Sequence, residues 1–350
     1  MTEQVAASIE ELGWDDAREA EFAPFRADGL VPGRVAIEHR IAYVLMTGAG
    51  ETWAELPGRL RHEGVKPAVG DWVAIQPIDG GRAQVQAVLE RRTKFSRKTL
   101  QTAEEQVLAT NVDVVFLLQA LTSDLNVRRL ERYLTMGWES GATPVVVLTK
   151  SDVCDDVQGL VEIVEAVALG VPVHPISNVT GEGLDDVRAY LHGNRTAALL
   201  GSSGVGKSTL VNRLMGEEVL ATQELRADGK GRHTTSHRQL LLVPGGGIVI
   251  DTPGMRELQL WESETGLEET FDDVESLAAG CRFSDCKHEH EPGCAVTAAL
   301  LDGSLAPERM ESYRKLQREL RALQLKTDAR ARAEQRREYR IRERAMRKKP

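Results

Sequence analysis

The chain of 350 residues has few cysteines and no long apolar run, and both absences narrow its class. Three of its four cysteines fall between Cys281 and Cys294, which is poor material for a disulfide framework. No apolar stretch approaches the roughly 20 residues needed to cross a bilayer. The acidic first residues lack the basic, then apolar, layout of a signal peptide. We therefore expect a cytoplasmic protein that does not contact a membrane.

Net positive charge is lacking over most of the chain and is found at its end. The net charge is -9, yet residues 326–350 hold eleven Lys or Arg against four Asp or Glu. This asymmetry is consistent with one localised contact to a polyanion rather than general coating of nucleic acid. A solvated helix end is the alternative, and the charge run alone favours it.

The first hundred residues predict an extension followed by a small β domain. Residues 1–29 form the extension, and five short alternating runs then occupy residues 30–89. Such runs predict an all-β barrel of the OB type, with an SH3-like barrel as the alternative. A basic strip, residues 91–98, completes this domain (30–100) as a linker, and it either binds RNA phosphates or is simply solvated.

The rest of the chain predicts an α/β domain and then a helical domain. Between residues 101 and 265, continuous apolar runs alternate with amphipathic helices, which predicts a parallel sheet with helices on both faces. Residues 266–350 contain a cysteine-rich stretch and a long helix that ends in the basic tail. The apolar stripe of this helix consists of Met310, Tyr313, Leu316, Leu320 and Leu323.

A phosphate-binding loop follows a predicted strand within the α/β domain. The segment "GSSGVGKST" fits the pattern GxxxxGK[ST] at every fixed position. Its glycines allow the backbone N–H groups to cradle phosphates at the positive end of the next helix. Lys207 would reach the β- and γ-phosphates, and Ser208 would ligate Mg²⁺. The predicted loop residues are Gly201, Ser202, Ser203, Gly204, Val205, Gly206, Lys207, Ser208 and Thr209.

The turn that reads guanine is missing downstream of this loop, and a matching turn lies upstream. The stretch "TKSD" ends a buried apolar run, and Asp152 can accept hydrogen bonds from the ring N1–H and the amine of guanine. Adenine offers no such pair of donors. A later stretch, "ISNVTGEGL", resembles the second base-contacting loop. The residues predicted to contact the base are Thr149, Lys150, Ser151, Asp152, Ser177 and Asn178.

Two further GTPase motifs follow the phosphate loop. In "GRHTTS", either Thr234 or Thr235 would complete the Mg²⁺ shell, and the sequence does not decide which. Asp251 would hold Mg²⁺ through water, and the N–H of Gly254 would sense the γ-phosphate. The base-reading turns thus precede the phosphate loop, which predicts a circularly permuted GTPase because strand ends, and not chain order, define the site. Asp152 and the Asp251-x-x-Gly254 pattern disfavour an ATP-dependent kinase.

Together with the barrel, "DTPGMREL" and the late Cys/His cluster, these motifs resemble the ribosome small-subunit-dependent GTPase A family. The resemblance covers about residues 30–325. It implies an OB domain, a permuted GTPase core and a C-terminal zinc domain. It also implies GTP hydrolysis stimulated by the small ribosomal subunit and its rRNA, late in maturation of that subunit. We expect the protein to be a monomer. The alternative to a GTP-hydrolysing switch is a nucleotide-sensing RNA-binding module with negligible turnover.

Two positions depart from the general GTPase pattern. Thr149 stands in place of the usual Asn, whose side chain bonds the base and the phosphate loop. Because threonine lacks the amide group, we expect modest affinity for the nucleotide. Met255 stands where many GTPases have a water-orienting Gln, and its thioether cannot do that work. His233 is the expected catalytic residue, because a neutral imidazole can accept a proton from water and the resemblance points to it as well. Its alternative role is to shape the loop or contact RNA.

The cysteine cluster predicts a metal site. Cys281, Cys286, His288 and Cys294 match the family's zinc ligands, and three thiolates with one imidazole suit a closed, structural Zn²⁺. On spacing alone His290 could replace His288, and three reduced cysteines in a loop are the alternative. We expect one Zn²⁺, and Mg²⁺ together with GTP.

Overall fold

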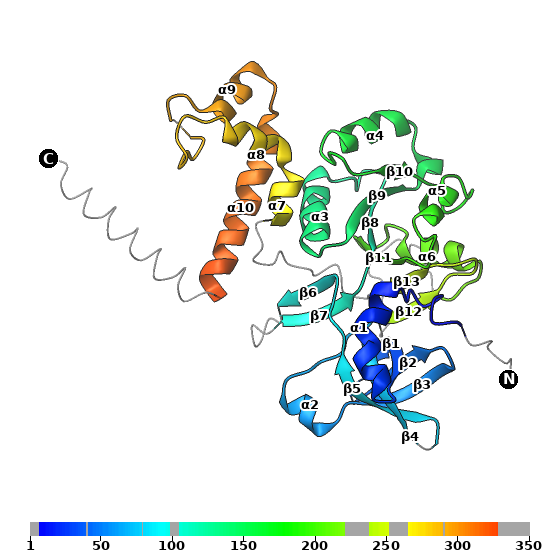
Figure 1. Ribbon diagram of the computed structural model, residues 1–350. Coiled ribbons are helices and arrows are strands. Elements are labelled where there is room, and N and C mark those ends of the chain that lie inside the picture. Colours follow the sequence, from blue (N-terminus) through cyan, green and yellow to red (C-terminus); the bar gives the residue numbers. More distant parts are fainter. Residues whose placement is uncertain are drawn as a thin grey trace, which may run out of the picture.

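A computed structural model describes residues 7–39, 41–78, 80–98, 105–220, 238–251, 265–289 and 291–327. For residues 98, 265 and 323–327 only the backbone is described. The barrel lies on one side of the α/β domain, and a helical unit with the long helix α10 lies on another (Figure 1). Within these ranges, no helix combines the length and the apolar character that a bilayer crossing requires.

The N-terminal barrel is closed. Its strands follow one another in the order β1-β2-β3-β5-β4, and β4 pairs back onto β1. β3 and β5 are parallel, whereas the other neighbours are antiparallel, as in a Greek-key barrel of the OB type, which confirms the predicted barrel fold. The short helix α2 (Gly58–His62) packs Leu60 into the interior. The strands are β1 (Val31–Glu38), β2 (Ala42–Thr47), β3 (Gly50–Glu55), β4 (Trp72–Ile78) and β5 (Arg82–Val88).

The N-terminal extension carries a helix that covers the barrel. Helix α1 (Asp16–Ala27) begins where the Asp15 side chain accepts a 2.8 Å hydrogen bond from the N–H of Arg18. Trp14 meets Phe22 and Trp72 edge to face, with ring centroids 5.5 and 4.7 Å apart. The extension therefore forms a second small core on the outer face of the barrel.

The basic strip forms a strand where the sequence predicted a linker. β6 (Lys94–Lys98) pairs in antiparallel fashion with β7 (Glu105–Thr110), and Phe95 is buried beneath the pair. Three of the strip's five positive charges pair with carboxylates of this chain, which leaves less of the charge for phosphate contacts. Arg91 pairs with Asp71, Arg92 with Asp15, and Lys94 with Glu105.

The α/β domain is built on six neighbouring strands in the order β10-β9-β8-β11-β13-β12. All are parallel except β12, which is antiparallel to β13, so the predicted parallel sheet is in fact mixed. The short connection between these two strands explains the difference, because only antiparallel strands can be joined by a tight turn. β12 also bridges β1, which joins the barrel and this domain into one continuous sheet. The strands are β8 (Val114–Ala120), β9 (Thr143–Thr149), β10 (Val173–Pro175), β11 (Thr196–Gly201), β12 (Gln239–Leu242) and β13 (Ile248–Asp251).

Helices cover both faces of this sheet. Alternate residues of β8, such as Leu117 and Phe116, belong to different cores. One core includes helices α3 (Val127–Glu139) and α4 (Val157–Glu165), and the other includes α5 (Leu184–Ala189) and α6 (Lys207–Met215). The C-terminal ends of the parallel strands meet at one edge, where the predicted phosphate loop, Asp152 and Asp251 lie.

A buried arginine fixes the extension and the barrel to strand β11. Arg34 donates hydrogen bonds to the carbonyls of Leu12, Gly70 and Asn111 and to the hydroxyl of Thr196. Burial lowers the pKa of Arg34 to about 10, so the group remains charged at neutral pH. Because Thr196 begins β11, this junction holds the strand whose other end leads into the phosphate loop.

The C-terminal helices pack against α3. Gly266 of α7 approaches α3 so closely that a Cβ there would lie 2.3 Å from the Thr135 carbonyl oxygen. Four of the five predicted stripe residues of α10 are buried, and the side chain of Leu323 lies outside the described residues. The helices are α7 (Thr265–Thr270), α8 (Asp272–Ala279), α9 (Ala295–Asp302) and α10 (Pro307–Thr327).

Candidate functional site

The phosphate loop lies between β11 and α6, as the sequence predicts. Gly206 has a φ of +102°, and a Cβ there would come within 2.9 Å of the Asn178 amide nitrogen, so only glycine fits. The Lys207 ammonium group folds back over the loop and donates hydrogen bonds to the carbonyls of Gly201 and Ser202, at 2.7 and 2.6 Å. The loop thus offers one lysine, a run of backbone N–H groups and a helix N-terminus, which together suit a polyphosphate.

The first base-reading turn is attached to the phosphate loop. The hydroxyl of Thr149, which is fully buried at the end of β9, donates a 2.6 Å hydrogen bond to the carbonyl of Val205. Lys150 follows in the left-handed backbone region, and the N–H of Ser151 then bonds the carbonyl of Ile176. From the sequence it was doubtful whether Thr149, in place of asparagine, could bond the phosphate loop. The structure shows that Thr149 forms this hydrogen bond.

The second base-reading loop holds Asp152. The Ser177 hydroxyl donates a 2.7 Å hydrogen bond to Oδ1 of Asp152 and accepts hydrogen bonds from the N–H groups of Val179 and Thr180. The Asn178 amide donates to the carbonyl of Gly206 at 3.2 Å. Both predicted base-reading segments therefore meet the phosphate loop at the same edge of the sheet.

Two buried polar atoms beside these turns have no partner among the described residues. They are the Ser151 hydroxyl and the side-chain oxygen of Asn178. A buried polar atom is costly unless it forms a hydrogen bond, so these atoms suit a bound group that carries its own donors and acceptors. A purine base with N–H and carbonyl groups meets that requirement.

Asp251 ends β13 close to the phosphate loop. Burial raises the pKa of its carboxyl group, and the positive charge of Lys207 opposes this shift. A carboxylate at Asp251 and the hydroxyl of Ser208 are oxygen ligands of the kind that Mg²⁺ prefers. Five residues singled out in the sequence lie outside the described part of the chain, so their roles remain predictions. These are His233, Thr234, Thr235, Gly254 and Met255.

One acidic residue at this edge was missed by the sequence analysis. Oδ2 of Asp124 accepts a 3.1 Å hydrogen bond from the hydroxyl of Ser202 in the phosphate loop. Arg129, in the first turn of α3, pairs with the same carboxylate at 2.9 Å and balances its charge. The available signal was positional, because Asp124 follows the buried strand β8, which lies next to β11.

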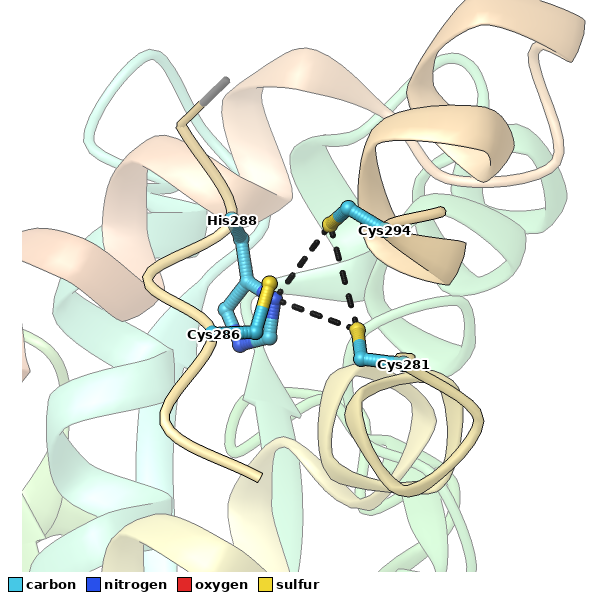
Figure 2. Close-up of side chains that lie close together, drawn as sticks. All are labelled: Cys281, Cys286, His288 and Cys294. Carbon is cyan, nitrogen blue, oxygen red and sulfur yellow. Dashed lines mark hydrogen bonds between the residues drawn. The ribbon is translucent and has the colours of Figure 1, made fainter. Parts of the chain in front are cut away.

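The Cys/His cluster lies at the connection between α8 and α9 (Figure 2). Cys281 comes just after α8, and the Cys294 thiol accepts a hydrogen bond from the N–H of Thr297 at the start of α9. Cys286 and His288 project toward them from the intervening loop. Arg314 of α10 donates a hydrogen bond to the carbonyl of His288 and so ties this loop to the long helix.

The dimensions of this cluster fit a tetrahedral zinc ion. The Sγ atoms of Cys281 and Cys294 are 3.8 Å apart, and each lies 3.5 Å from Nδ1 of His288. Zn–S and Zn–N bonds of about 2.3 and 2.0 Å give tetrahedral edges of about 3.8 Å for S–S and 3.5 Å for S–N. All four ligand atoms, that of Cys286 included, lie within 4.8 Å of one another. The predicted ligand set is therefore assembled, whereas His290 lies outside the described residues.

Comparison with known proteins gives matches over most of the chain. The family model described as RsgA GTPase matches residues 88–261, and that described as 50S ribosome-binding GTPase matches residues 196–327. "Small ribosomal subunit biogenesis GTPase RsgA" of Opitutus terrae is 50% identical over 328 residues, which cover 89% of either chain. Its namesake in Streptomyces coelicolor is 47% identical over 342 residues, covering 96% of this chain and 93% of the relative.

Two solved structures share the fold. YjeQ from Thermotoga maritima has a TM-score of 0.65 at 28% identity, over 83% of this chain and 98% of its own. YloQ, described as a circularly permuted GTPase, has a TM-score of 0.63 at 21% identity, over 85% of this chain and 96% of its own. The order of the base-reading turns and the phosphate loop agrees with that description. Given this arrangement and the identity to relatives over nearly its whole length, the protein belongs to the RsgA GTPase family.

Proposed function

We propose that the protein hydrolyses GTP as a switch in late maturation of the small ribosomal subunit, and that contact with the subunit stimulates hydrolysis. The observation that carries this proposal is the attachment of both base-reading segments to the phosphate loop. Thr149 and Asn178 bond the loop carbonyls, and Ser177 holds the Asp152 carboxylate. A site whose base-reading segments are joined to the phosphate loop in this way supports selection of one base together with a polyphosphate.

The proposed nucleotide contacts follow from these positions. Asp152 accepts hydrogen bonds from guanine, the stem of Lys150 packs on the base, and Ser151 and Asn178 complete the base pocket. The phosphate-loop N–H groups and Lys207 bind and orient the phosphates. When bound, Mg²⁺ neutralises phosphate charge. The residues that would hold it are Ser208, Asp251 and either Thr234 or Thr235.

We further propose that one structural Zn²⁺ binds at Cys281, Cys286, His288 and Cys294. The tetrahedral spacing of the ligand atoms supports this assignment. The barrel and the zinc-bearing helical domain would contact rRNA or ribosomal protein. The names of the relatives support the small subunit as the partner. On this proposal the protein works in the cytoplasm as a monomer.

Turnover measurements with purified ribosomal subunits test the proposal. Phosphate release from GTP and from ATP is measured with the protein alone, with small subunits and with large subunits. We expect slow hydrolysis of GTP alone, marked stimulation by small subunits only, and no hydrolysis of ATP. A GTP rate that small subunits leave unchanged would instead favour a nucleotide-sensing RNA-binding module. Stimulation by large subunits alone would show that the small subunit is not the partner.

A further inference from the structure

An arginine near the end of α6 contacts the second base-reading loop, although no nucleotide-binding motif includes it. Nε of Arg213 donates a hydrogen bond to the carbonyl of Asn178, and Nη2 donates one to the carbonyl of Val179, both at 2.6 Å. A planar guanidinium group can bridge two successive carbonyls in this way, whereas an ammonium group lacks the fork. Arg213 thus binds the backbone of the loop.

The same loop is also held at the start of α6. There Asn178 donates its amide hydrogen to the carbonyl of Gly206, the residue just before the helix. The loop is consequently fixed at two points of one helix, next to the phosphate loop at one point and through Arg213 at the other. Loss of the Arg213 contacts would leave only the Asn178 contact between the loop and α6 among the side-chain hydrogen bonds of the described residues.

The held segment determines where the Asp152 carboxylate lies. The hydroxyl of Ser177, the residue before Asn178, accepts from the N–H groups of Val179 and Thr180 and donates to Oδ1 of Asp152. A shift of the backbone at Asn178 and Val179 would therefore move the hydroxyl that orients Asp152. The contact of Arg213 with two carbonyls is linked by this route to the group expected to read the base.

We propose that Arg213 is a positioning residue that keeps the second base-reading loop closed, slows nucleotide release and sharpens selection of guanine. The selectivity part rests on the proposed function, in which Asp152 reads guanine. Arg213 lies partly in solvent, which weakens its hydrogen bonds relative to buried ones. We therefore expect its loss to speed release about tenfold, the effect of one or two charge-assisted hydrogen bonds.

Arg188 of α5 provides a control, because its side chain contacts the end of α6. Its Nη2 donates hydrogen bonds to the carbonyls of Arg213 and Leu214, and its Nη1 donates one to that of Pro244. Two of these carbonyls belong to the end of α6 and the third lies between β12 and β13, so none belongs to the base-reading loop. Arg188→Met removes a comparable set of contacts without touching residues 177–179.

Stopped-flow release of a fluorescent GDP analogue from the full-length protein tests the proposal. Competition with GDP, inosine diphosphate and ADP reports selectivity, because inosine lacks the exocyclic amine that Asp152 is expected to bind. We expect Arg213→Met to release the analogue about tenfold faster and to narrow the preference for GDP over inosine diphosphate. Arg213→Lys should lie between it and wild type, and Arg188→Met should match wild type.

Two results would overturn the proposal. One is a rate of analogue release from Arg213→Met within about twofold of the wild-type rate, well below the expected effect. The other is an equal acceleration in Arg188→Met, which would mean that Arg213 merely stabilises the helix. A wild-type protein that binds ADP as tightly as GDP would refute guanine reading, and with it the selectivity part. The release rates would still decide whether Arg213 holds the loop.

Discussion

The Thr149 hydroxyl and the Val205 carbonyl form a 2.6 Å hydrogen bond that joins the base-reading turn to the phosphate loop. Thr149 lies at the end of β9 and Val205 within the loop after β11, with β8 between the two strands. Many GTPases use an asparagine at the position of Thr149, and the substitution suggested a weakened site. The shorter hydroxyl nonetheless reaches the loop, so this tie between the two halves of the site is kept.

Thr149→Val should weaken nucleotide binding without unfolding the domain. Valine keeps the shape of threonine but leaves the Val205 carbonyl without this donor. A hydrogen bond of this kind contributes about 1 kcal/mol, and an unsatisfied buried carbonyl raises the cost to about 1–3 kcal/mol. We expect GDP affinity to fall about tenfold in a fluorescence titration, because 1.4 kcal/mol corresponds to that factor. Thr143→Val, at the exposed start of the same strand, is the control. Equal affinities in both variants would show that the tie is dispensable.

Asp152→Asn should exchange guanine for xanthine. The variant keeps a side-chain oxygen that can accept from Ser177, so the loop should remain in place. It presents an amide where guanine needs a second acceptor, and a site built for a hydrogen bond rejects an unsuited base by about 10⁴. Binding of GTP and xanthosine triphosphate is compared by competition. Retained GTP affinity together with no gain for xanthosine triphosphate would remove Asp152 from base recognition.

Features carried by local spacing were predictable from the sequence. The phosphate loop needs its glycines at fixed intervals, and the zinc ligands need thiols and an imidazole within one short stretch. Asp152 could be placed because it ends a buried apolar run, and strand ends in such a sheet share one edge. These signals depend on neighbours along the chain, which a single sequence shows directly.

Contacts between distant segments were not predictable in the same way. The Thr149–Val205 bond and the Arg213 contacts depend on how strands and helices pack across the sheet. Strand β6 was hidden for another reason, since its polar face is charged and Phe95 is its only buried residue among the described side chains. The sequence therefore predicted which groups would bind the nucleotide, but not which side chains hold the segments of the site together.

Cys286→Ser should release zinc and unfold the C-terminal helical domain. A structural zinc site contributes folding free energy on the order of 10 kcal/mol in zinc-finger peptides. We expect metal analysis to show about one zinc per wild-type chain and little in the variant. Limited proteolysis should then cut beyond residue 265 while GDP binding persists. Cys154→Ser is the control, because Cys154 is half-buried and lies outside the cluster. A zinc content near zero in carefully purified wild-type protein would count against the site.

His233→Ala should abolish most of the subunit-stimulated rate while sparing GTP affinity and subunit binding. The prediction rests on the sequence, since Met255 cannot orient water and an imidazole near neutral pKa can. A general base contributes about 10²–10⁴ in rate. Single-turnover hydrolysis at saturating small subunits measures the loss. His237→Ala, in the same segment, controls for altered loop shape. If the stimulated rate of His233→Ala lay within about twofold of the wild-type rate, His233 would not be the general base.

The last prediction concerns the contact between α3 and the C-terminal helical domain. Arg309 of α10 donates a 2.9 Å hydrogen bond to Glu131 of α3, and both side chains are at least 95% buried. The same guanidinium group binds both carboxylate oxygens of Asp273 and lies 4.2 Å from the ring centre of Phe271. These contacts join the GTPase core to the helices that flank the Cys/His cluster.

Arg309→Met should be strongly destabilising because it leaves the Glu131 carboxylate buried and uncompensated, at a cost of about 3–5 kcal/mol. Arg309→Met combined with Glu131→Gln should be less destabilised than Arg309→Met alone, since an amide is cheaper to bury than a charge. Arg128→Met is the matched control: its partner Glu311 is exposed, and such pairs contribute about 0–1 kcal/mol. Urea denaturation of the zinc-loaded protein without nucleotide gives the free energies of unfolding for the resulting double-mutant cycle. If the double variant were as unstable as the sum of the single variants, the pair would be uncoupled. The junction between the two domains would then depend on its other contacts, among them the packing of α7 and α10 against α3.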